Sequence, residues 1–285
     1  MSANHFQITG DRIDSQAEFF RREENGVWRN LLYYPETLES ESRSPVVLNN
    51  KTFLEVSFKD TDVNNVRFIN CKFIGCLFIG ATLNDCEFTN CSFKDTNTSK
   101  IKIRNCLFDP KCFEDNFDLI NDTNIAIDLY HSLYRNASEE HQPEHALNSL
   151  YQMKKAENAH LDSQKNRKKI TKKEYLKKKA GHLIYDFVSG YGLKTSRVLR
   201  LLLIVIGSFA VINYVLSSWI FPATTDLSFI DSIYFTCVTI STLGYGDITP
   251  VTSFGRLWVT AQALTGFVVL SIFLAAVANT ALRAR

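Results

Sequence analysis

The sequence predicts a mixed membrane protein, with a soluble N-terminal domain of five-residue repeats followed by an all-α domain that crosses a membrane twice. Two observations support this fold class. Large apolar residues recur at almost every fifth position from Leu48 to Phe113. No Lys or Arg occurs between Arg200 and Arg256, whereas residues 165–179 contain nine. A chain of 285 residues is long enough for both domains.

Residues 1–45 carry no motif that predicts a structure or a function. The opening stretch MSANHFQITGDRIDSQ lacks the apolar core of a secretory signal. We therefore expect the soluble part of the chain to lie in the cytoplasm. The seven cysteines are then expected to be thiols, because that compartment is reducing.

Residues 46–115 repeat with a period of five. The large position of each repeat is apolar except at Thr98, and its members are Leu48, Phe53, Phe58, Val63, Phe68, Phe73, Phe78, Leu83, Phe88, Phe93, Thr98, Ile103, Phe108 and Phe113. Smaller residues, five cysteines among them, mostly stand two positions earlier, and turn-forming Asn, Asp or Gly mostly stand two positions later. This period fits neither an α-helix nor an ordinary strand.

The pattern resembles the pentapeptide-repeat family. The resemblance implies a right-handed quadrilateral β-helix with one repeat on each of four sides. Large residues would stack in internal columns, and small residues would fill the space beside the chain. Coils stacked about 4.8 Å apart would hydrogen-bond to one another. The fourteen repeats predict about three and a half coils.

The cysteines and charges of the repeat argue against two other roles. Cys71, Cys76, Cys86 and Cys91 follow the repeat period with no His between them, which favours buried packing over metal binding. Pentapeptide-repeat proteins that mimic DNA are acidic, whereas residues 46–115 hold nine basic and nine acidic side chains. No nucleic-acid partner is therefore expected.

Residues 116–173 predict a helical hairpin and a basic linker. The hairpin helices, 117–135 and 143–162, are amphipathic and resemble a single tetratricopeptide-like pair, which has to pack on the repeat domain or on a neighbouring subunit. The basic run 165–179 would suit nucleic acid, anionic lipid headgroups or plain solvation. Its place before a membrane segment favours anionic lipids, at about 1 kcal/mol per basic residue.

Residues 174–197 predict a helix in the membrane interface. Apolar residues fall on one face of its first part, 174–189, and two glycines follow this part. Lys194, Arg197 and Arg200 recur every third residue, as in a voltage sensor. Only one long uncharged run, 201–221, follows them before the segment 227–241, so no helical bundle would hold such charges at membrane depth. We expect them to anchor the membrane segment on its cytoplasmic side.

Residues 198–285 predict a membrane domain. Residues 201–221 and 257–282 are uncharged runs of 21 and 26 residues, each long enough to cross a hydrocarbon core of about 30 Å. Basic residues precede the first run and follow the second. This charge bias predicts that both termini face the cytoplasm.

A short segment between the two runs is not expected to cross the membrane. Residues 227–241 show helical spacing, with Asp226 or Ser228 able to cap the start, and reach only about 20 Å. Such a re-entrant segment is tolerated at membrane depth only where it is buried in protein or lines a water-filled path. The residues that follow it are therefore expected to line such a path.

The motif Thr242-Leu243-Gly244-Tyr245-Gly246-Asp247 follows this segment. Its glycines allow the positive φ values that let successive carbonyls face one axis, and its acid raises the local concentration of cations. The motif resembles the filter of two-transmembrane potassium channels. The resemblance divides the domain into an outer helix 198–221, a pore helix 227–241, a filter 242–247 and an inner helix 256–283.

The resemblance also implies the site residues. K+ would be bound by the carbonyls of Thr242, Leu243, Gly244 and Tyr245 and by the Thr242 hydroxyl, with Gly246 and Asp247 supporting the filter and its outer mouth. Leu243 stands where the family commonly has valine, and its backbone carbonyl is what would bind the ion. Selectivity is therefore expected to survive, with a change in filter packing.

The inner helix holds candidates for gating. Gly266 is a candidate hinge, and close helix packing explains a glycine there equally well. Phe273 or Leu274 could close a hydrophobic gate near the cytoplasmic end. No acid lies between Leu257 and Leu282, which argues against block by polyamines.

The sequence thus predicts a homotetrameric, potassium-selective channel in a bacterial inner or plasma membrane. It would conduct K+ passively, without catalysis and without a cofactor, since the sequence shows no catalytic triad, phosphate loop or metal motif. The repeat domain is expected to regulate opening through residues 174–189 or to assist assembly, and its cytoplasmic partner or ligand has no signature in the sequence. Two alternatives stay open: a membrane-tethered repeat scaffold, and a poorly selective cation channel.

Overall fold

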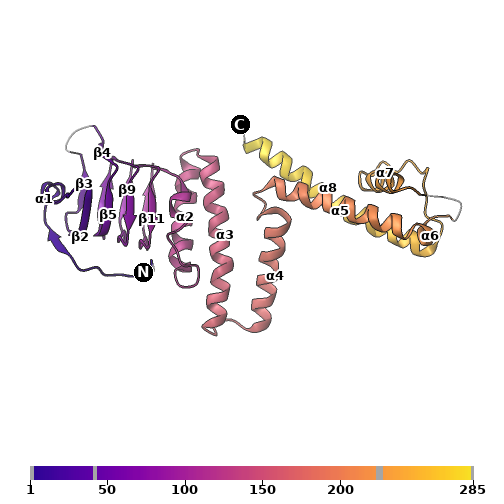
Figure 1. Ribbon diagram of the computed structural model, residues 1–285, viewed down its shortest axis with the longest axis horizontal. Coiled ribbons are helices and arrows are strands. Elements are labelled where there is room, and N and C mark those ends of the chain that lie inside the picture. Colours follow the sequence, from indigo (N-terminus) through magenta and orange to yellow (C-terminus); the bar gives the residue numbers. More distant parts are fainter. Residues whose placement is uncertain (1–2, 41–43, 223–226, 284–285) are drawn as a thin grey trace. The chain divides into compact units, whose positions relative to one another are not determined.

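The chain folds into two units, one built around a parallel β-solenoid and one built from apolar helices. The computed structural model describes residues 3–40, 44–222 and 227–283. The first unit is Met1–Ala180 and the second is Gly181–Arg285. Figure 1 labels the elements in chain order.

The strands of the first unit are short, and most of them recur with the five-residue period of the repeat. They are β1 (Asp11–Ile13), β2 (Val27–Tyr33), β3 (Thr37–Glu39), β4 (Val46–Asn49), β5 (Thr52–Ser57), β6 (Asp62–Asn64), β7 (Val66–Ile69), β8 (Lys72–Ile74), β9 (Thr82–Asn84), β10 (Glu87–Thr89), β11 (Ser92–Lys94), β12 (Lys102–Arg104) and β13 (Leu107–Phe108). The helices of this unit are α1 (Gln16–Arg21), the 3-10 turn η1 (Pro110–Phe113), α2 (Thr123–Glu139) and α3 (Pro143–Asn166). Helix α4 (Lys172–Ser189) starts in the first unit and ends in the second.

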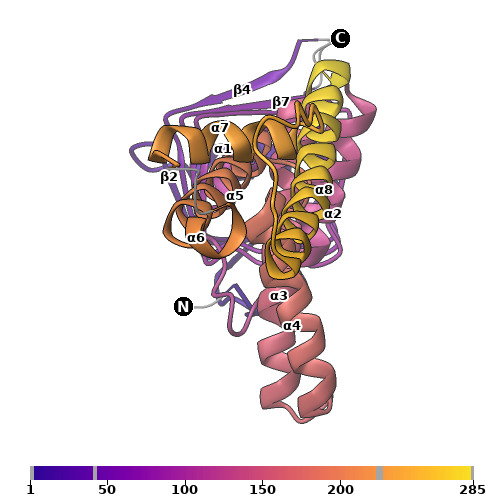
Figure 2. The same cartoon turned by 90° about the vertical axis from the view of Figure 1, so that its right-hand side faces the viewer.

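The strands stack into three parallel sheets, which form three sides of the solenoid (Figure 1). Their orders are β1-β2-β5-β8-β11, β13-β10-β7-β4 and β12-β9-β6-β3, and Figure 2 shows β4 and β7 side by side. Single backbone bridges hold the fourth side, at Ser57, Leu77 and Asn97. Phe53 pairs with Phe73, twenty residues later, so one coil contains four five-residue repeats. The predicted four-sided β-helix is confirmed.

Stacked aromatic rings form the core, as the large position of the repeat predicts. One column contains Phe19, Trp28, Phe53, Phe73, Phe93 and Phe113, with successive ring centroids 5.1, 4.9, 4.7, 4.5 and 4.3 Å apart. Most of these separations match the spacing of neighbouring strands, so each ring lies on the ring of the next coil. Stacked pairs add about 0.5–1.5 kcal/mol beyond the burial of their surface.

The corners between the sides use the left-handed backbone region. Residues two positions after the large residue have positive φ, among them Asn50, Asp60, Asn65, Asn70, Gly75, Gly80, Asp85, Asn90 and Asn105. Gly, Asn and Asp adopt this region at the least steric cost. The turn-forming residues of the repeat are therefore explained by backbone geometry.

The solenoid begins before residue 46, the predicted boundary, and includes strands from residues 1–45. Trp28, Tyr33 and Leu38 are buried at five-residue spacing. The coil that contains Leu38 is five residues longer than the next, since β3 pairs with residues 25 positions later and β4 with residues 20 positions later. This insertion between β3 and β4 interrupts the run of apolar positions. The largest sheet therefore stacks five strands, more than the three and a half coils expected.

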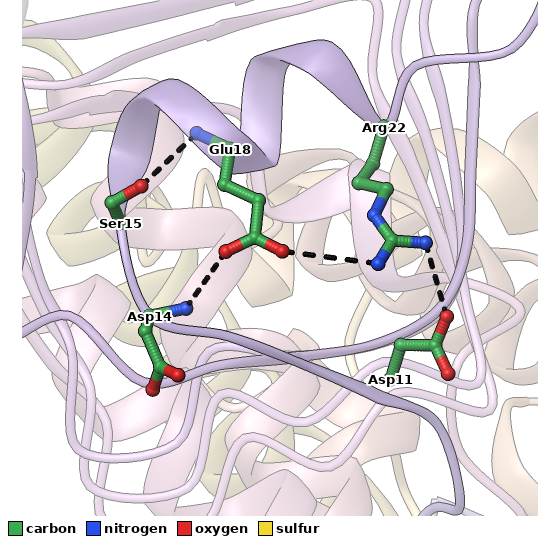
Figure 3. Close-up of polar contacts among 5 residues, drawn as sticks. All are labelled: Asp11, Asp14, Ser15, Glu18 and Arg22. Atoms are coloured by element: carbon green, nitrogen blue, oxygen red, sulfur yellow. Dashed lines mark hydrogen bonds and ion pairs between the residues drawn. The ribbon is translucent and has the colours of Figure 1, made fainter.

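Helix α1 is fixed at the N-terminal end of the solenoid by exposed polar contacts (Figure 3). Ser15 Oγ accepts from the Glu18 amide at 3.2 Å, and the Glu18 carboxylate accepts from the Asp14 amide at 3.3 Å. The Arg22 guanidinium contacts Asp11 at 3.1 Å and Glu18 at 3.8 Å. Because these charges are solvated, they define the local turn more than they add to stability.

Two asparagine side chains close the C-terminal end of the solenoid. Asn116 accepts from the Thr96 amide at 2.9 Å and donates to the Thr96 carbonyl at 3.0 Å. Asn136 of α2 does the same for Cys106, at 2.9 and 2.7 Å. Each side-chain amide replaces the backbone partner that a further coil would supply, which satisfies part of the open edge.

Helix α2 packs its apolar face on the last coil. Leu129, Tyr130 and Leu133 belong to the same buried cluster as Phe108. This confirms that the hairpin packs on the repeat domain. The predicted first helix, 117–135, is displaced, because the Asp118 carboxylate accepts from the Ile120 amide and holds a turn before α2 begins at Thr123.

One carboxylate joins α3 to the start of α4. Asp162 accepts from the Tyr175 hydroxyl and from Lys179 Nζ, each at 2.7 Å. Partial burial alone would raise the pKa of Asp162, but the hydrogen bonds from Lys179 and Tyr175 lower it below its ordinary value. The Lys165 ammonium lies 4.4 Å from the centroid of the Tyr175 ring. Part of the basic run 165–179 is therefore engaged within the protein.

The second unit contains the candidate membrane spans. Among the described residues, two helices are long and apolar enough to cross a membrane: α5 (Thr195–Val215) and α8 (Ser253–Arg283). Two shorter helices, α6 (Ser217–Ile220) and α7 (Phe229–Ile240), lie between them in the chain. Helix α7 has 12 residues and is too short to span.

One predicted helix boundary in this region differs from the structure, and another agrees with it. The outer helix, predicted over 198–221, is divided because α5 ends before Leu216 and α6 begins after it. In the interfacial segment predicted over 174–197, helix α4 ends at Ser189, as the predicted break at Gly190 and Gly192 requires. The three residues that follow, Gly190 to Gly192, all have positive φ, which no α-helix can contain.

Candidate functional site

Helix α7 precedes the motif 242–247 and starts at a capped end. Ser228 Oγ accepts from the Asp231 amide at 3.2 Å, and the Asp231 carboxylate accepts from the Ser228 amide at 3.0 Å. This reciprocal pair satisfies donors that the first turn leaves open. Of the two caps predicted, Ser228 is observed, and Asp226 lies outside the described residues.

The backbone of residues 242–246 has positive φ at every second residue. φ is 61° at Thr242, 57° at Gly244 and 80° at Gly246, with Leu243 and Tyr245 outside the left-handed region. Positive φ at alternate residues permits successive carbonyls to face one axis. The motif therefore has a backbone that can present a row of oxygens to a cation.

Contacts at both ends tie the motif to α7. The Val238 carbonyl accepts from the amides of Leu243 at 3.1 Å and Gly244 at 3.4 Å. At the other end, the Tyr234 hydroxyl donates to Asp247 Oδ2 at 2.8 Å. The position of α7 therefore sets the position of the motif.

The side chains of the motif are not covered by their own chain. Leu243 is 61% exposed and Tyr245 is 67% exposed, and a Cβ added at Gly244 or Gly246 would meet nothing within 4 Å. Other exposed large apolar residues of this unit include Trp219, Ile230, Leu257, Leu264 and Phe267. Apolar surface of this extent needs a cover of lipid or of further protein.

Helix α8 packs closely on α7 at one glycine. A Cβ at Gly266 would lie 2.4 Å from Cγ1 of Ile240, so any side chain there would displace the neighbouring helix. Phe273 packs against the same buried cluster as Ile240. Leu274 is 58% exposed. Of the two predicted gate residues, Leu274 is thus the one whose side chain is largely uncovered by its own chain.

Buried polar side chains join α5, α7 and α8. Asn213 Nδ2 donates to Thr236 Oγ1 at 3.0 Å and to Gln262 Oε1 at 2.9 Å. The Trp258 indole donates to Asn213 Oδ1 at 3.0 Å. We call these four residues the amide cluster. The sequence interpretation missed this cluster and also missed Tyr234. The available signal was an amide side chain within each uncharged run, Asn213 in the first and Gln262 in the second.

Side chains at the start of α5 contact both α4 and α8. Arg197 Nη1 lies 2.7 Å from Asp186 Oδ1, near the end of α4. Thr195 Oγ1 lies 2.7 Å from Thr280 Oγ1, near the end of α8. The connection from α4 to α5 is thus linked by side chains to the inner helix.

The cysteines of the repeat are buried thiols. Cys71, Cys76, Cys86, Cys91 and Cys106 are buried and free of disulfides. Their Sγ atoms donate to carbonyls of the preceding coil, as Cys76 does to Phe53 at 3.3 Å. Burial raises the pKa of the Cys76 thiol to about 12. Across residues 3–40, 44–222 and 227–283, no group of three or more His, Cys, Asp and Glu side chains could hold a metal ion.

Comparison with known proteins divides the chain in a similar way. Residues 197–283 match a family described as ion channel, and residues 61–97 and 71–108 match pentapeptide repeats, with eight copies. Over 74 residues, 26% of this chain and 26% of the relative, the sequence is 39% identical to two-pore potassium channel 4 of Arabidopsis thaliana. The match thus spans about a quarter of that relative. The chain is therefore a membrane protein in which a segment similar to an ion-channel family follows a pentapeptide-repeat domain.

Proposed function

We propose that four copies of this chain surround one pore that conducts K+ passively and selectively. The proposal depends above all on the alternating backbone of residues 242–246, which follows a capped short helix and lies between two helices long enough to span. The ion is bound by the carbonyls of Thr242, Leu243, Gly244 and Tyr245 and by the Thr242 hydroxyl, with Gly246 and Asp247 at the outer end.

Four copies supply the surroundings that one chain lacks. A single strand of carbonyls contacts an ion from one side, whereas a ring of four strands replaces its whole hydration shell. The exposed side chains of Leu243 and Tyr245 and the exposed face of α8 are then buried between chains or in lipid. The match to an ion-channel family and to a relative named as a potassium channel supports the same assignment.

The gate in this proposal lies in the cytoplasmic half of α8. Leu274 meets its counterparts from the other chains and closes the pore by excluding water. Phe273 instead holds α8 in the buried cluster with Leu202 and Val269. Gly266 acts as a packing position rather than a hinge, because its missing side chain admits Ile240.

The first unit is proposed to lie in the cytoplasm next to the membrane. The basic run 165–179 before the first span favours this side, and it attracts anionic headgroups. Leu183, Ile184 and Phe187 of α4 are exposed apolar residues, as a helix lying in the membrane interface requires.

Regulation by the first unit would pass through the end of α4. The Asp186–Arg197 ion pair and the Thr195–Thr280 hydroxyl contact connect α4 to α5 and α5 to α8. Deleting residues 1–160 and recording open probability in planar bilayers tests this path. A shifted open probability supports regulation, whereas unchanged gating would make the repeat domain an assembly or docking module.

Flux into liposomes tests the proposed function. We expect K+ flux that Ba2+ blocks and a reversal potential that follows the K+ gradient in mixed Na+ and K+. Gly246→Ala should abolish flux without loss of protein, because residue 246 has a φ of 80°. Gly207→Ala is the control, since a Cβ there meets nothing within 4 Å. Equal Na+ and K+ flux would indicate a poorly selective cation channel, and no flux from assembled protein would favour a tethered scaffold.

A further inference from the structure

The amide cluster lies at the junction of α5, α7 and α8 in the membrane domain. Asn213 belongs to α5, Thr236 to α7 and Gln262 to α8, and all three are fully buried. The Asn213 amide makes three of the four hydrogen bonds it can form: two from Nδ2 and one at Oδ1. One side chain thus connects all three helices.

Removing the Asn213 side chain would leave Thr236, Gln262 and Trp258 without the hydrogen bonds they make to it. A buried donor or acceptor that loses its partner costs about 1–3 kcal/mol, whereas replacing a whole bonded set by apolar groups of similar shape is nearly neutral. Gln262 Nε2 already has no hydrogen-bond partner among the described residues. An apolar junction would therefore hold the three helices together about as well. Because interhelical hydrogen bonds in membranes add only about 0.6 kcal/mol each on average, stability alone does not explain the polar residues.

The direction of the bonds gives the amide cluster another use. Apolar contact fixes the distance between helices but resists rotation about the helix axis weakly, whereas a hydrogen bond has a required direction. On α7, Thr236 and Ile240 are one turn apart and lie on the same face. Thr236 is held by Asn213, and Ile240 by its close contact with Gly266. Helix α7 is thus held at two points that together oppose rotation.

Rotation of α7 would move the motif at both ends. Tyr234, two residues before Thr236, bonds Asp247. Val238, two residues after Thr236, bonds Leu243 and Gly244. The Thr236 attachment lies between these two, so a change there is transmitted to the backbone of residues 242–247.

We propose that Asn213 is a positioning residue for ion selectivity: through Thr236 it fixes the rotation of α7 and thereby the spacing of the filter carbonyls. Asn213 itself is on the outer helix and is not among the residues that bind the ion. The inference rests on the proposed function, because it concerns the selectivity of the same filter.

The test compares two variants of the full-length chain in liposomes by the ratio of Na+ to K+ permeability. Asn213→Leu removes the central amide. The apolar variant combines Asn213→Leu, Thr236→Val, Gln262→Leu and Trp258→Phe, so that no member of the amide cluster is left unpaired. Ser208→Ala is the control on the same helix, since its hydroxyl bonds only its own helix at Ile204, 2.7 Å away.

We expect the apolar variant to assemble with the thermal stability of the original chain and to show a permeability ratio raised by about threefold or more. Asn213→Leu should raise the ratio as well, and Ser208→Ala should leave it unchanged. If the apolar variant assembles and keeps the original ratio, the amide cluster is only structural and the inference is overturned, even if Asn213→Leu fails to assemble. If the original chain conducts no K+, the proposed function fails and this inference fails with it.

Discussion

The hydroxyl of Thr195 lies 2.7 Å from the hydroxyl of Thr280, which joins the first turn of α5 to the end of α8. Thr195 also approaches the Ala276 carbonyl, at 3.5 Å. A loop of five residues, 190–194, separates α4 from α5. The contact therefore links the segment that follows α4 to the end of α8.

Thr280→Val removes this hydroxyl and keeps the shape of the side chain. Open probability in planar bilayers should change by about threefold, because one hydrogen bond is worth about 0.5–1.5 kcal/mol. Ion selectivity should stay the same, since the filter is not touched. Thr260→Val is the matched control, as its hydroxyl bonds only Arg256 of its own helix at 2.8 Å. Equal effects of the two variants would contradict a specific role for the Thr195 contact.

Tyr234→Phe tests the attachment of the motif at its outer end. The variant keeps the ring but removes the 2.8 Å hydrogen bond to Asp247. We expect potassium flux that decays during sustained conduction, because the outer end of the motif loses a directional restraint. Tyr214→Phe, on the exposed face of α5, is the control. Stable flux in Tyr234→Phe over the same time course would show that the bond is dispensable.

Gly266→Ala separates packing from hinge bending. A Cβ would lie 2.4 Å from Ile240, so α7 or α8 must shift, and overpacking of this kind costs about 1–3 kcal/mol. Thermal unfolding of the detergent-solubilised protein should occur at lower temperature. Adding Ile240→Ala removes the atoms in closest contact and should restore part of the stability. A hinge role predicts the opposite: normal stability, altered opening and no rescue by the second substitution.

Asn136→Ala opens the C-terminal end of the solenoid. The Cys106 amide loses its buried partner, at about 1–3 kcal/mol, while the Cys106 carbonyl keeps a hydrogen bond from Gln142 Nε2 at 3.3 Å. Hydrogen exchange measured by mass spectrometry should show faster exchange at residues 102–108, while the first coils stay protected. Ser138→Ala is the control on the same helix, because its hydroxyl bonds only Tyr134 at 2.7 Å. Uniform exchange across all coils would mean that Asn136 does not close the end locally.

Alkaline pH should destabilise the solenoid through the buried Cys76 thiol. The Cys76 thiol has an ordinary pKa of 9.0, and burial raises the pKa to about 12 in the folded protein. Between these values the unfolded chain releases a proton that the folded chain keeps, so the free energy of unfolding falls as pH rises, by about 1.4 kcal/mol per pH unit at most. The free energy of unfolding, measured with urea between about pH 8 and pH 11, should therefore fall less steeply with pH for Cys76→Ala than for the original chain. If the free energy of unfolding falls equally with pH in both proteins, the Cys76 thiol is not the cause of the destabilisation.

Features that depend on residues near one another in the sequence were predictable. The columns of stacked rings follow from the five-residue period, and the capped start of α7 follows from Ser228, three residues before Asp231. The early coils were not recognised, because the five-residue insertion between β3 and β4 interrupts the run of apolar positions, although Trp28, Tyr33 and Leu38 keep the spacing.

Contacts between distant residues were not predictable from pattern. Asn213 and Gln262 are 49 residues apart, and Tyr234 and Asp247 are 13 apart. Whether such side chains meet depends on the rotation and crossing of α5, α7 and α8. That rotation is set by packing detail, such as the space left by Gly266 for Ile240.

The sequence alone determined the architecture: a period of five, two uncharged runs and a filter-like motif after a capped short helix. These signals are local, since period, length and capping act within a few residues of the chain. Only the tertiary structure decided where the solenoid begins, how Asn116 and Asn136 close it, and which side chains connect the three membrane helices. Those outcomes depend on strand register and helix rotation, which arise when segments far apart in the chain pack together and satisfy their buried polar groups.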